Sequence, residues 1–199
     1  MTRDENSEST SLIVELETER LRLSEIVDAD AIDVFSIFGS AKTMAFYDVE
    51  TITELAQAKS LIASWADRAS SGQGLRWGIR LRETDELIGT CGFNVWSPRM
   101  RSATLGYDLR EDHWGKGYAS EAVSRILEAG FGGELPCGPL HRIQADTVPR
   151  NERSESLLRK LGFVEEGMRR EAGYWKGRFH DLKCFGLLEP EFCPVQPRT

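Results

Sequence analysis

The stretch from Leu105 to Ile126 constrains the fold of this chain more than any other, and it reads LGYDLREDHWGKGYASEAVSRI. Its first residues are typical of the end of an apolar strand, and residues 114–119 form a glycine-rich turn. Apolar residues then recur at the spacing of one helix face; they are Ala119, Ala122, Val123, Ile126 and Leu127. The stretch therefore predicts a strand, a glycine loop and the start of a helix.

A helix start that follows glycines can bind a phosphate group. The first backbone N–H groups of a helix have no partner within the helix, and the helix dipole is positive at that end. Gly115 and Gly117 lack Cβ atoms, so the chain can bend there and a ligand can approach the amides closely. We interpret the loop as a phosphate cradle; the alternative is a plain glycine turn before an ordinary helix.

The spacing of this loop excludes two other phosphate-binding motifs. A Walker A loop needs glycine where Arg110 stands, and Ser or Thr where Gly117 stands. A dinucleotide fingerprint that starts at Gly115 needs a third glycine where Ser120 stands. Neither motif fits.

The composition is that of an ordinary globular chain of one domain. Of its 199 residues, 40% are hydrophobic and 29% are charged, and the formal net charge is −7. An acidic balance argues against general affinity for nucleic acid, which requires clustered Lys and Arg. Residues 1–11 lack the features of a signal peptide, and no window of 18 residues is free of charge. We therefore expect a cytoplasmic protein without nucleic-acid or membrane partners.

Cysteine and histidine spacing indicates neither a disulfide framework nor a zinc site. No two cysteines form a CxxC pair, and the three histidines lie far apart in sequence. We expect reduced thiols and no bound metal. The cysteines are Cys91, Cys137, Cys184 and Cys193.

Hydrophobic periodicity and turn residues predict the remaining elements. The expected strands are Thr18–Leu23, Arg76–Arg82, Leu87–Val95, Ser102–Leu109, Arg142–Val148, and roughly Phe163–Tyr174 and Phe179–Leu188. Four helices are expected. The first spans about Asp28–Phe38, and the second follows a capping box at Thr51 and Glu54 and ends at Gly72. The third follows the glycine loop and ends at Gly132, and the fourth runs from Asn151 to Gly162. A strand, helix, strand passage through the glycine loop requires a right-handed crossover and a locally parallel strand pair.

This element order and two motifs resemble the GNAT acetyltransferase superfamily. WGKGYASEA resembles its acyl-CoA loop, with Trp114 replacing the usual Gln or Arg, as is common in the RimJ/RimL branch. NERSESLLRKLGFVEEGMRRE, from Asn151 on, resembles the second diagnostic stretch. The resemblance covers residues 13–190 and leaves flexible tails at 1–12 and 191–199. It implies an α+β (mixed α/β) fold, with a mostly antiparallel sheet of six or seven strands splayed at a parallel pair and about four flanking helices.

The resemblance also implies a place for acetyl-CoA as cosubstrate, between the strand ending at Leu109 and the strand ending at Thr147. Amides of the loop would bind the pyrophosphate, and we expect Lys116 to be solvated rather than to help bind it. Asn151 would contact the pantetheine arm, hold a water or act as a plain helix cap. The implied CoA-binding residues are Tyr107, Leu109, Trp114, Gly115, Lys116, Gly117, Tyr118, Ala119, Ser120, Asn151 and Ser154.

The resemblance assigns catalytic roles to three residues. Many GNAT proteins protonate the departing thiolate with a Tyr, but that position is Leu158 here, and Ser154 matches the acid of the RimL-like branch. RimL-like enzymes carry a Glu base at the position of Gly173, so Glu171, two residues earlier on the same strand face, is one candidate base. Asp108 is the rival. We expect His113 to have a surface role beside the phosphates.

The activity implied is direct transfer of an acetyl group to a primary amine. The acceptor would be the N-terminal α-amine of a protein, such as a ribosomal protein, or a small amine such as an antibiotic or polyamine. A non-catalytic acyl-CoA-binding regulatory module is the alternative. The expected acceptor segment, Gly39 to Glu50, carries no motif that chooses among these. Both a monomer and a homodimer remain open.

Overall fold

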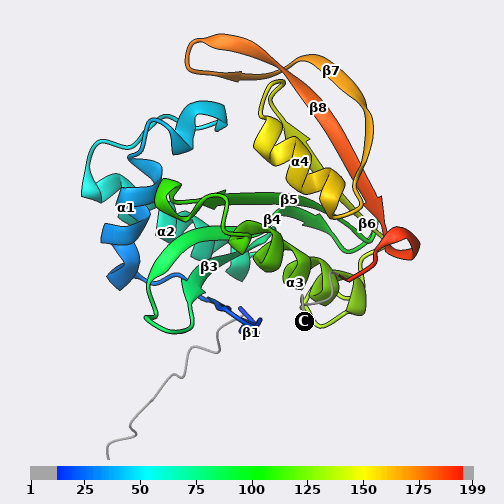
Figure 1. Ribbon diagram of the computed structural model, residues 1–199, viewed down its shortest axis with the longest axis horizontal. Coiled ribbons are helices and arrows are strands. Elements are labelled where there is room, and N and C mark those ends of the chain that lie inside the picture. Colours follow the sequence, from blue (N-terminus) through cyan, green and yellow to red (C-terminus); the bar gives the residue numbers. More distant parts are fainter. Residues whose placement is uncertain (1–12, 195–199) are drawn as a thin grey trace, which may run out of the picture.

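The computed structural model describes residues 13–194, in which one eight-stranded sheet has the order β1-β2-β3-β4-β5-β6-β8-β7 (Figure 1). The strands are β1 (Leu16–Glu17), β2 (Leu21–Ser24), β3 (Leu75–Leu81), β4 (Leu87–Ser97), β5 (Ser102–Leu109), β6 (Arg142–Thr147), β7 (Val164–Trp175) and β8 (Arg178–Leu188). The α-helices of the described residues are α1 (Ala31–Phe38), α2 (Leu55–Ser70), α3 (Tyr118–Gly132) and α4 (Glu152–Lys160). The predicted mixed α/β class is confirmed.

Three predicted details differ from the structure. The sheet has one strand more than expected, because β1 is only two residues long and is too short to show a period. The strand predicted at Thr18–Leu23 begins later, at Leu21, since the preceding residues form the turn between β1 and β2. The capping box at Thr51 and Glu54 is wrong: α2 begins at Leu55, and Gln57 Oε1 accepts from the Glu54 N–H at 3.0 Å.

The sheet has a buried cluster on each face. Trp77 and Ile79 of β3 are fully buried in the larger cluster, together with the apolar stripe of α3 and with Leu158 of α4. The smaller cluster contains the buried residues of α1, with Ala58 and Ile62 of α2 and with Leu87. Because side chains alternate along a strand, α3 and α4 cover one face while α1 and α2 cover the other. No helix of residues 13–194 is long and apolar enough to cross a membrane.

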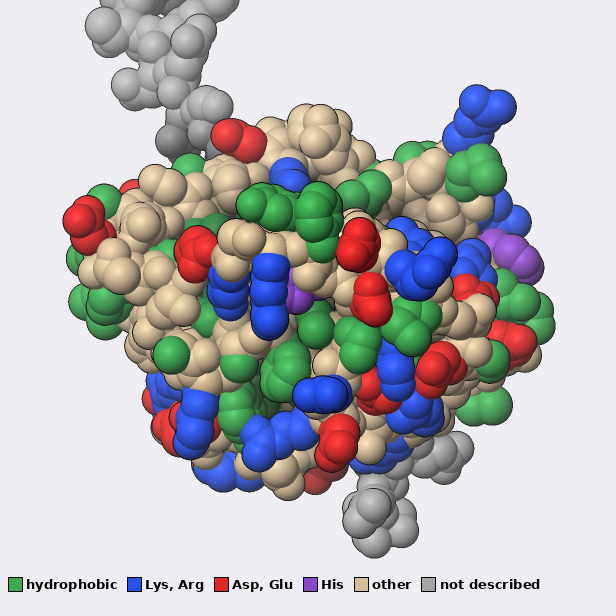
Figure 2. All heavy atoms as spheres, turned by 90° about the horizontal axis from the view of Figure 1, so that it is seen from above, with side chains coloured by type: hydrophobic (Ala, Val, Ile, Leu, Met, Phe, Trp, Pro, Cys, Tyr) green, Lys and Arg blue, Asp and Glu red, His purple; other side chains and the backbone are tan. Residues whose placement is uncertain are grey.

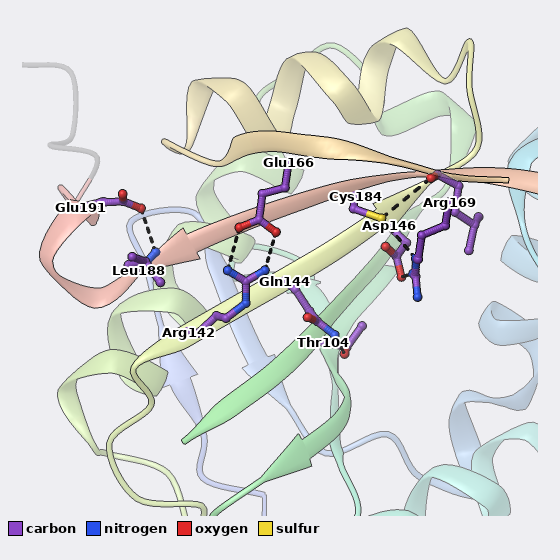
Figure 3. A network of polar contacts seen from close by, with 10 residues as sticks. Thr104, Arg142, Gln144, Asp146, Glu166, Arg169, Cys184, Leu188 and Glu191 are labelled. Carbon is purple, nitrogen blue, oxygen red and sulfur yellow. Dashed lines mark hydrogen bonds and ion pairs between the residues drawn. The ribbon is translucent and has the colours of Figure 1, made fainter. Parts of the chain in front are cut away.

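The sheet splays between β5 and β6, which form the predicted parallel pair. Their pairing runs only from Ser102 opposite Arg142 to Thr104 opposite Gln144. At that last pair Gln144 Nε2 donates to Thr104 Oγ1 at 3.1 Å (Figure 3). Beyond it β5 stays paired with β4, and β6 stays paired with β8. The two strands therefore separate, and each has one free edge in the gap.

The hairpin of β7 and β8 continues the sheet beyond β6. Arg142 on β6 and Glu166 on β7 form a bidentate ion pair across β8, at 2.5 to 2.7 Å (Figure 3). The pair lies over Gly186, where a Cβ would come within 2.4 Å of Glu166 Oε1. At the hairpin tip, Lys176 Nζ donates to Met44 O at 2.5 Å, in the 3₁₀ helix η2 (Thr43–Phe46). This contact joins the hairpin to the α1 side of the molecule (Figure 1).

The predicted tails fall largely outside the described residues. Residues 1–12 and 195–199 are not described, so those parts of the expectation stay predictions. Within 191–194, Phe192 packs against Phe131 of α3 with ring centroids 5.3 Å apart. The packed chain thus continues slightly past residue 190.

Candidate active site

The glycine loop presents the start of α3 as predicted. Gly115 and Gly117 have φ angles of 75° and 84°, a region that residues with a Cβ rarely adopt. Gly117 caps α3 without a side chain, and the first intrahelical donor is the N–H of Glu121, which bonds to Gly117 O at 3.1 Å. The amides of Tyr118, Ala119 and Ser120 come before that bond. Backbone donors therefore gather at the positive end of α3.

A side-chain clamp that the sequence did not reveal fixes this loop. Glu121 Oε1 accepts from Thr18 Oγ1 at 2.6 Å, and Glu121 Oε2 accepts from Arg20 Nε at 2.7 Å. Arg20 also donates to Lys116 O at 3.0 Å and stacks over the Tyr118 ring at 4.6 Å. Burial alone would raise the pKa of Glu121, but the hydrogen bonds from Thr18 and Arg20 hold it below its usual range. The β1–β2 turn thus holds the loop before any ligand arrives.

Replacing Glu121 with Gln should lower the melting temperature at pH 7 by about 2–4 °C, the shift expected from roughly 1 kcal/mol in a chain of this size. The folded-state pKa of Glu121 is depressed, so its contribution is present above the unfolded pKa and is lost as pH falls through the folded pKa. The difference between variant and wild type should therefore shrink in acid. Thermal melts followed by circular dichroism at pH 7 and pH 4 check this.

Glu128→Gln is the matched control, since Glu128 lies on the same helix with only a 3.8 Å ion pair to Arg125. It should leave the melting temperature nearly unchanged at both pH values. Equal shifts in the two variants would contradict the clamp.

Trp114 links the loop to β5 and to α4. Its Nε1 donates to Leu109 O at 2.7 Å, at the end of β5. The Arg153 guanidinium, from α4, lies 4.4 Å from the centroid of the Trp114 ring. Leu109 is buried, whereas Lys116 is exposed, in line with the expectation that Lys116 is solvated. The aromatic at this position therefore bridges the mouth of the splay.

Ser154 and Tyr107 meet across the splay. Ser154 Oγ, on α4, lies 2.6 Å from Tyr107 Oη, on β5. Asn151 is the N-cap of α4, and its Oδ1 accepts from Ser154 N at 3.3 Å. Burial raises the pKa of Tyr107 to about 12, although the hydrogen bond with Ser154 acts in the opposite direction. Three of the predicted site residues are thus brought together, and the helix-cap role of Asn151 is confirmed.

Asp108 faces away from Ser154. Successive residues of a strand point to opposite faces, so Asp108 lies on the α1–α2 side while Tyr107 points to α4. Its carboxylate is 1% exposed, forms an ion pair with Arg76, and accepts from Thr90 N at 3.1 Å and Tyr47 Oη at 3.2 Å. Burial alone would lower the pKa of Arg76, but Tyr47 and Asp108 more than offset this and raise it. This carboxylate is held in a buried ion pair.

Glu171, the other candidate base, lies on β7. It occupies a bulge of β7 between Arg169 and Gly173, with a φ of 49°, and its N–H donates to Asp181 Oδ1 at 2.8 Å. The Glu171 side chain is exposed, and no hydrogen bond or ion pair joins its carboxylate to Ser154 in the part of the chain that the structure describes. Among the described residues, neither candidate base therefore forms a hydrogen bond with Ser154.

The structure corrects the expectation for His113. His113 is 8% exposed rather than on the surface; its Nε2 lies 2.9 Å from Arg110 Nη2, and burial lowers its pKa. On the hairpin, His180 pairs with Gly173, and its ring stacks on Trp175 at 4.0 Å. A Cβ at Gly173 would lie 1.9 Å from the Trp175 ring, so this pairing requires glycine. Only the register of the β7–β8 hairpin could have revealed this arrangement of His180, Gly173 and Trp175.

The site has the features of an enzyme that binds an acylated nucleotide: a splayed parallel pair, a glycine loop at a helix start and two hydroxyls across the gap. A family model described as Acetyltransferase (GNAT) domain matches residues 20–164. The chain therefore belongs to the GNAT acetyltransferase family, and it is an N-acetyltransferase. No group of three or more His, Cys, Asp or Glu within residues 13–194 is arranged to hold a metal ion.

Enzymes of the RimJ/RimL branch are among the proteins that this chain resembles. The uncharacterized N-acetyltransferase YoaA of Bacillus subtilis (strain 168) is 37% identical over 88% of this chain and 97% of its own. The [ribosomal protein uS5]-alanine N-acetyltransferase of Escherichia coli (strain K12) is 31% identical over 62% of each chain. The solved structure of RimL, a ribosomal L7/L12 alpha-N-protein acetyltransferase in complex with coenzyme A, shares the fold with a TM-score of 0.77 at 18% identity, covering 88% of this chain and 98% of its own.

Proposed function

We propose that this protein transfers the acetyl group of acetyl-CoA directly to the N-terminal α-amine of a protein in the cytoplasm. The observation that carries the proposal is the splay, in which parallel pairing stops at Thr104 and Gln144 while both strands continue. The pantetheine amides would bond to the free strand edges, as an added strand does. The pyrophosphate would lie on the amides that start α3, beside Gly115, where a Cβ would meet nothing within 4 Å.

The reaction requires two proton transfers, and the residues at the splay are suited to one of them. The attacking amine forms a bond to the thioester carbonyl carbon, the carbon–sulfur bond breaks, and the sulfur takes up a proton. We assign this donation to Ser154, whose hydroxyl lies beside Tyr107 at the splay. The amine must also lose a proton, and because Asp108 is occupied by Arg76 and Glu171 is exposed in a bulge, we assign this step to water.

The protein N-terminus as acceptor is supported by the relatives, whose names include enzymes for ribosomal proteins uS5 and L7/L12. The fold alone does not fix the acceptor, since the microcin C7 self immunity acetyltransferase MccE shares it with a TM-score of 0.76 at 18% identity. Figure 2 shows basic, acidic and hydrophobic side chains intermixed on the face seen from above. Charge on that face therefore does not select one class of acceptor.

The test is release of free thiol from acetyl-CoA with matched acceptors. One arm uses short peptides with a free N-terminal Ala, Ser or Met, and a second uses the same peptides with a blocked N-terminus and a free lysine. A third arm uses a polyamine and an aminoglycoside. Turnover only in the first arm is expected. Turnover only in the third would overturn the acceptor class, and CoA binding without turnover in any arm would favour a regulatory module.

The transfer should not pass through an acyl-cysteine. Burial raises the pKa of Cys91 to about 12 and also raises the pKa of Cys137, so neither thiol is activated. Single replacements of Cys91, Cys137, Cys184 and Cys193 by Ala should change kcat by less than about threefold, the range of small packing losses. Intact-protein mass spectrometry after incubation with acetyl-CoA alone should show no added acetyl group. An acetyl group on one cysteine, with turnover lost on its replacement, would contradict direct transfer.

A further inference from the structure

The hydroxyls of Tyr107 and Ser154 form a short hydrogen bond in which either oxygen could be the donor. The Oη–Oγ distance of 2.6 Å is that of a strong hydroxyl bond, whereas the Ser154 carbonyl is 3.4 Å from Tyr107 Oη. Ser154 is also fixed from its backbone, because its N–H bonds to Asn151 Oδ1. Among residues 13–194, the Ser154 hydroxyl therefore has one hydrogen-bond partner, donor or acceptor, which is the phenol.

The phenol is suited to be the donor in this pair. Burial raises the pKa of Tyr107 to about 12, so the phenol keeps its proton throughout the neutral range. If its O–H points to Ser154 Oγ, the serine proton has to point elsewhere. The phenol would then also stabilise the negative charge that develops on Oγ as the serine gives up its proton.

We propose that Tyr107 is the positioning residue of the acetyl transfer: it donates its hydrogen bond to Ser154 Oγ and thereby directs the serine proton to the departing sulfur. This inference rests on the proposed function. As the amine nitrogen bonds to the carbonyl carbon, the electron pair of the broken carbon–sulfur bond stays on sulfur. Sulfur takes the Ser154 proton, and Ser154 Oγ takes the Tyr107 proton. The proton released by the amine returns to the phenolate through solvent, so the balance is amine plus thioester to amide plus thiol.

A double-mutant cycle on turnover is the first test. Tyr107→Phe and Ser154→Ala should each lower kcat by about 10- to 100-fold, while the dissociation constant of acetyl-CoA stays within about threefold. Because the two hydroxyls act as a unit, the double variant should be no slower than Ser154→Ala alone. Tyr174→Phe is the matched control; it removes the hydroxyl of a hairpin tyrosine that is 63% exposed, and kcat should not change.

Titration of the thiol of bound CoA is the second test, and it needs no acceptor. Hydrogen bonding to the charged form favours that form, so thiolate absorbance should show the thiol of bound CoA titrating about one pKa unit below that of free CoA. Tyr107→Phe should remove most of this shift, and protein without CoA at each pH corrects for the cysteines. Tyr174→Phe should keep it.

The outcomes separate the two ideas. Wild type that fails to release thiol with every acceptor, yet shows a thiol shift that Tyr107→Phe abolishes, would refute the proposed function and retain the pairing. An active wild type in which Tyr107→Phe changes neither kcat nor the thiol shift would overturn the pairing. Additive losses in the cycle would do so as well, because they would mean that the phenol acts independently of Ser154.

Discussion

Gly117→Asp should weaken CoA binding at least a hundredfold while the protein stays folded. Gly117 is the N-cap of α3 with a φ of 84°, and an added Cβ would lie 3.4 Å from Arg20 Nη2. A carboxylate there would occupy the positive end of the helix that we assign to the pyrophosphate. Two like charges in such a contact cost several kcal/mol, and 1.4 kcal/mol is about tenfold in affinity.

The fold should tolerate this change for physical reasons. Aspartate is among the residues that adopt a positive φ at modest cost, and its carboxylate can bond to Arg20 and to the first amides of α3. The introduced carboxylate would therefore occupy the site that we assign to the pyrophosphate of CoA. Isothermal titration calorimetry with CoA, beside a thermal melt, measures both effects.

Gly138→Asp is the matched control for backbone strain. Gly138 has a φ of 71°, a Cβ there would meet nothing within 4 Å, and it lies in the connector after α3. It should show a similar small change in stability with CoA affinity unaltered. Undiminished CoA binding by a folded Gly117→Asp variant would refute the placement of the pyrophosphate.

Local patterns account for the parts of the fold that the sequence predicted well. The strand expected at Ser102–Leu109 coincides with β5, because its alternating apolar residues pack on one face. The helix after the loop and its end at the glycine pair follow from the 3.6-residue period and from Gly133 in the left-handed conformation. Asn151 could be identified as a cap because the whole interaction spans four residues.

The contacts that shape the site join residues distant in sequence, and no local pattern contains them. Arg20 and Glu121 are 101 residues apart, and Tyr107 and Ser154 are 47 apart. Each member alone looks like an ordinary surface or strand residue. Strand alternation predicts that Asp108 and Tyr107 face opposite sides of the sheet. Only the packed sheet shows that Arg76 lies on the Asp108 side and contacts its carboxylate.

Asp108→Asn should lower the free energy of unfolding by about 3 kcal/mol, which corresponds to a melting temperature lower by roughly 6–12 °C. The amide keeps the shape but removes the charge that balances buried Arg76, and its NH₂ group must face a donor, because Arg76, Thr90 and Tyr47 all donate to this side chain. Asp112→Asn is the matched control, since Asp112 is 63% exposed in its ion pair with Arg110 and should cost under about 1 kcal/mol.

The same variant decides whether Asp108 is a base. If the role of Asp108 is structural, the acidic limb of the kcat/KM profile is set by another group. The residual activity of Asp108→Asn should then keep that limb. Replacing both partners, as in Arg76→Met with Asp108→Leu, should recover part of the lost stability, since no uncompensated charge is left in the interior. A folded Asp108→Asn variant of wild-type stability that lacks the acidic limb would make Asp108 the base, and the amine would then lose its proton on the α1–α2 side of the sheet.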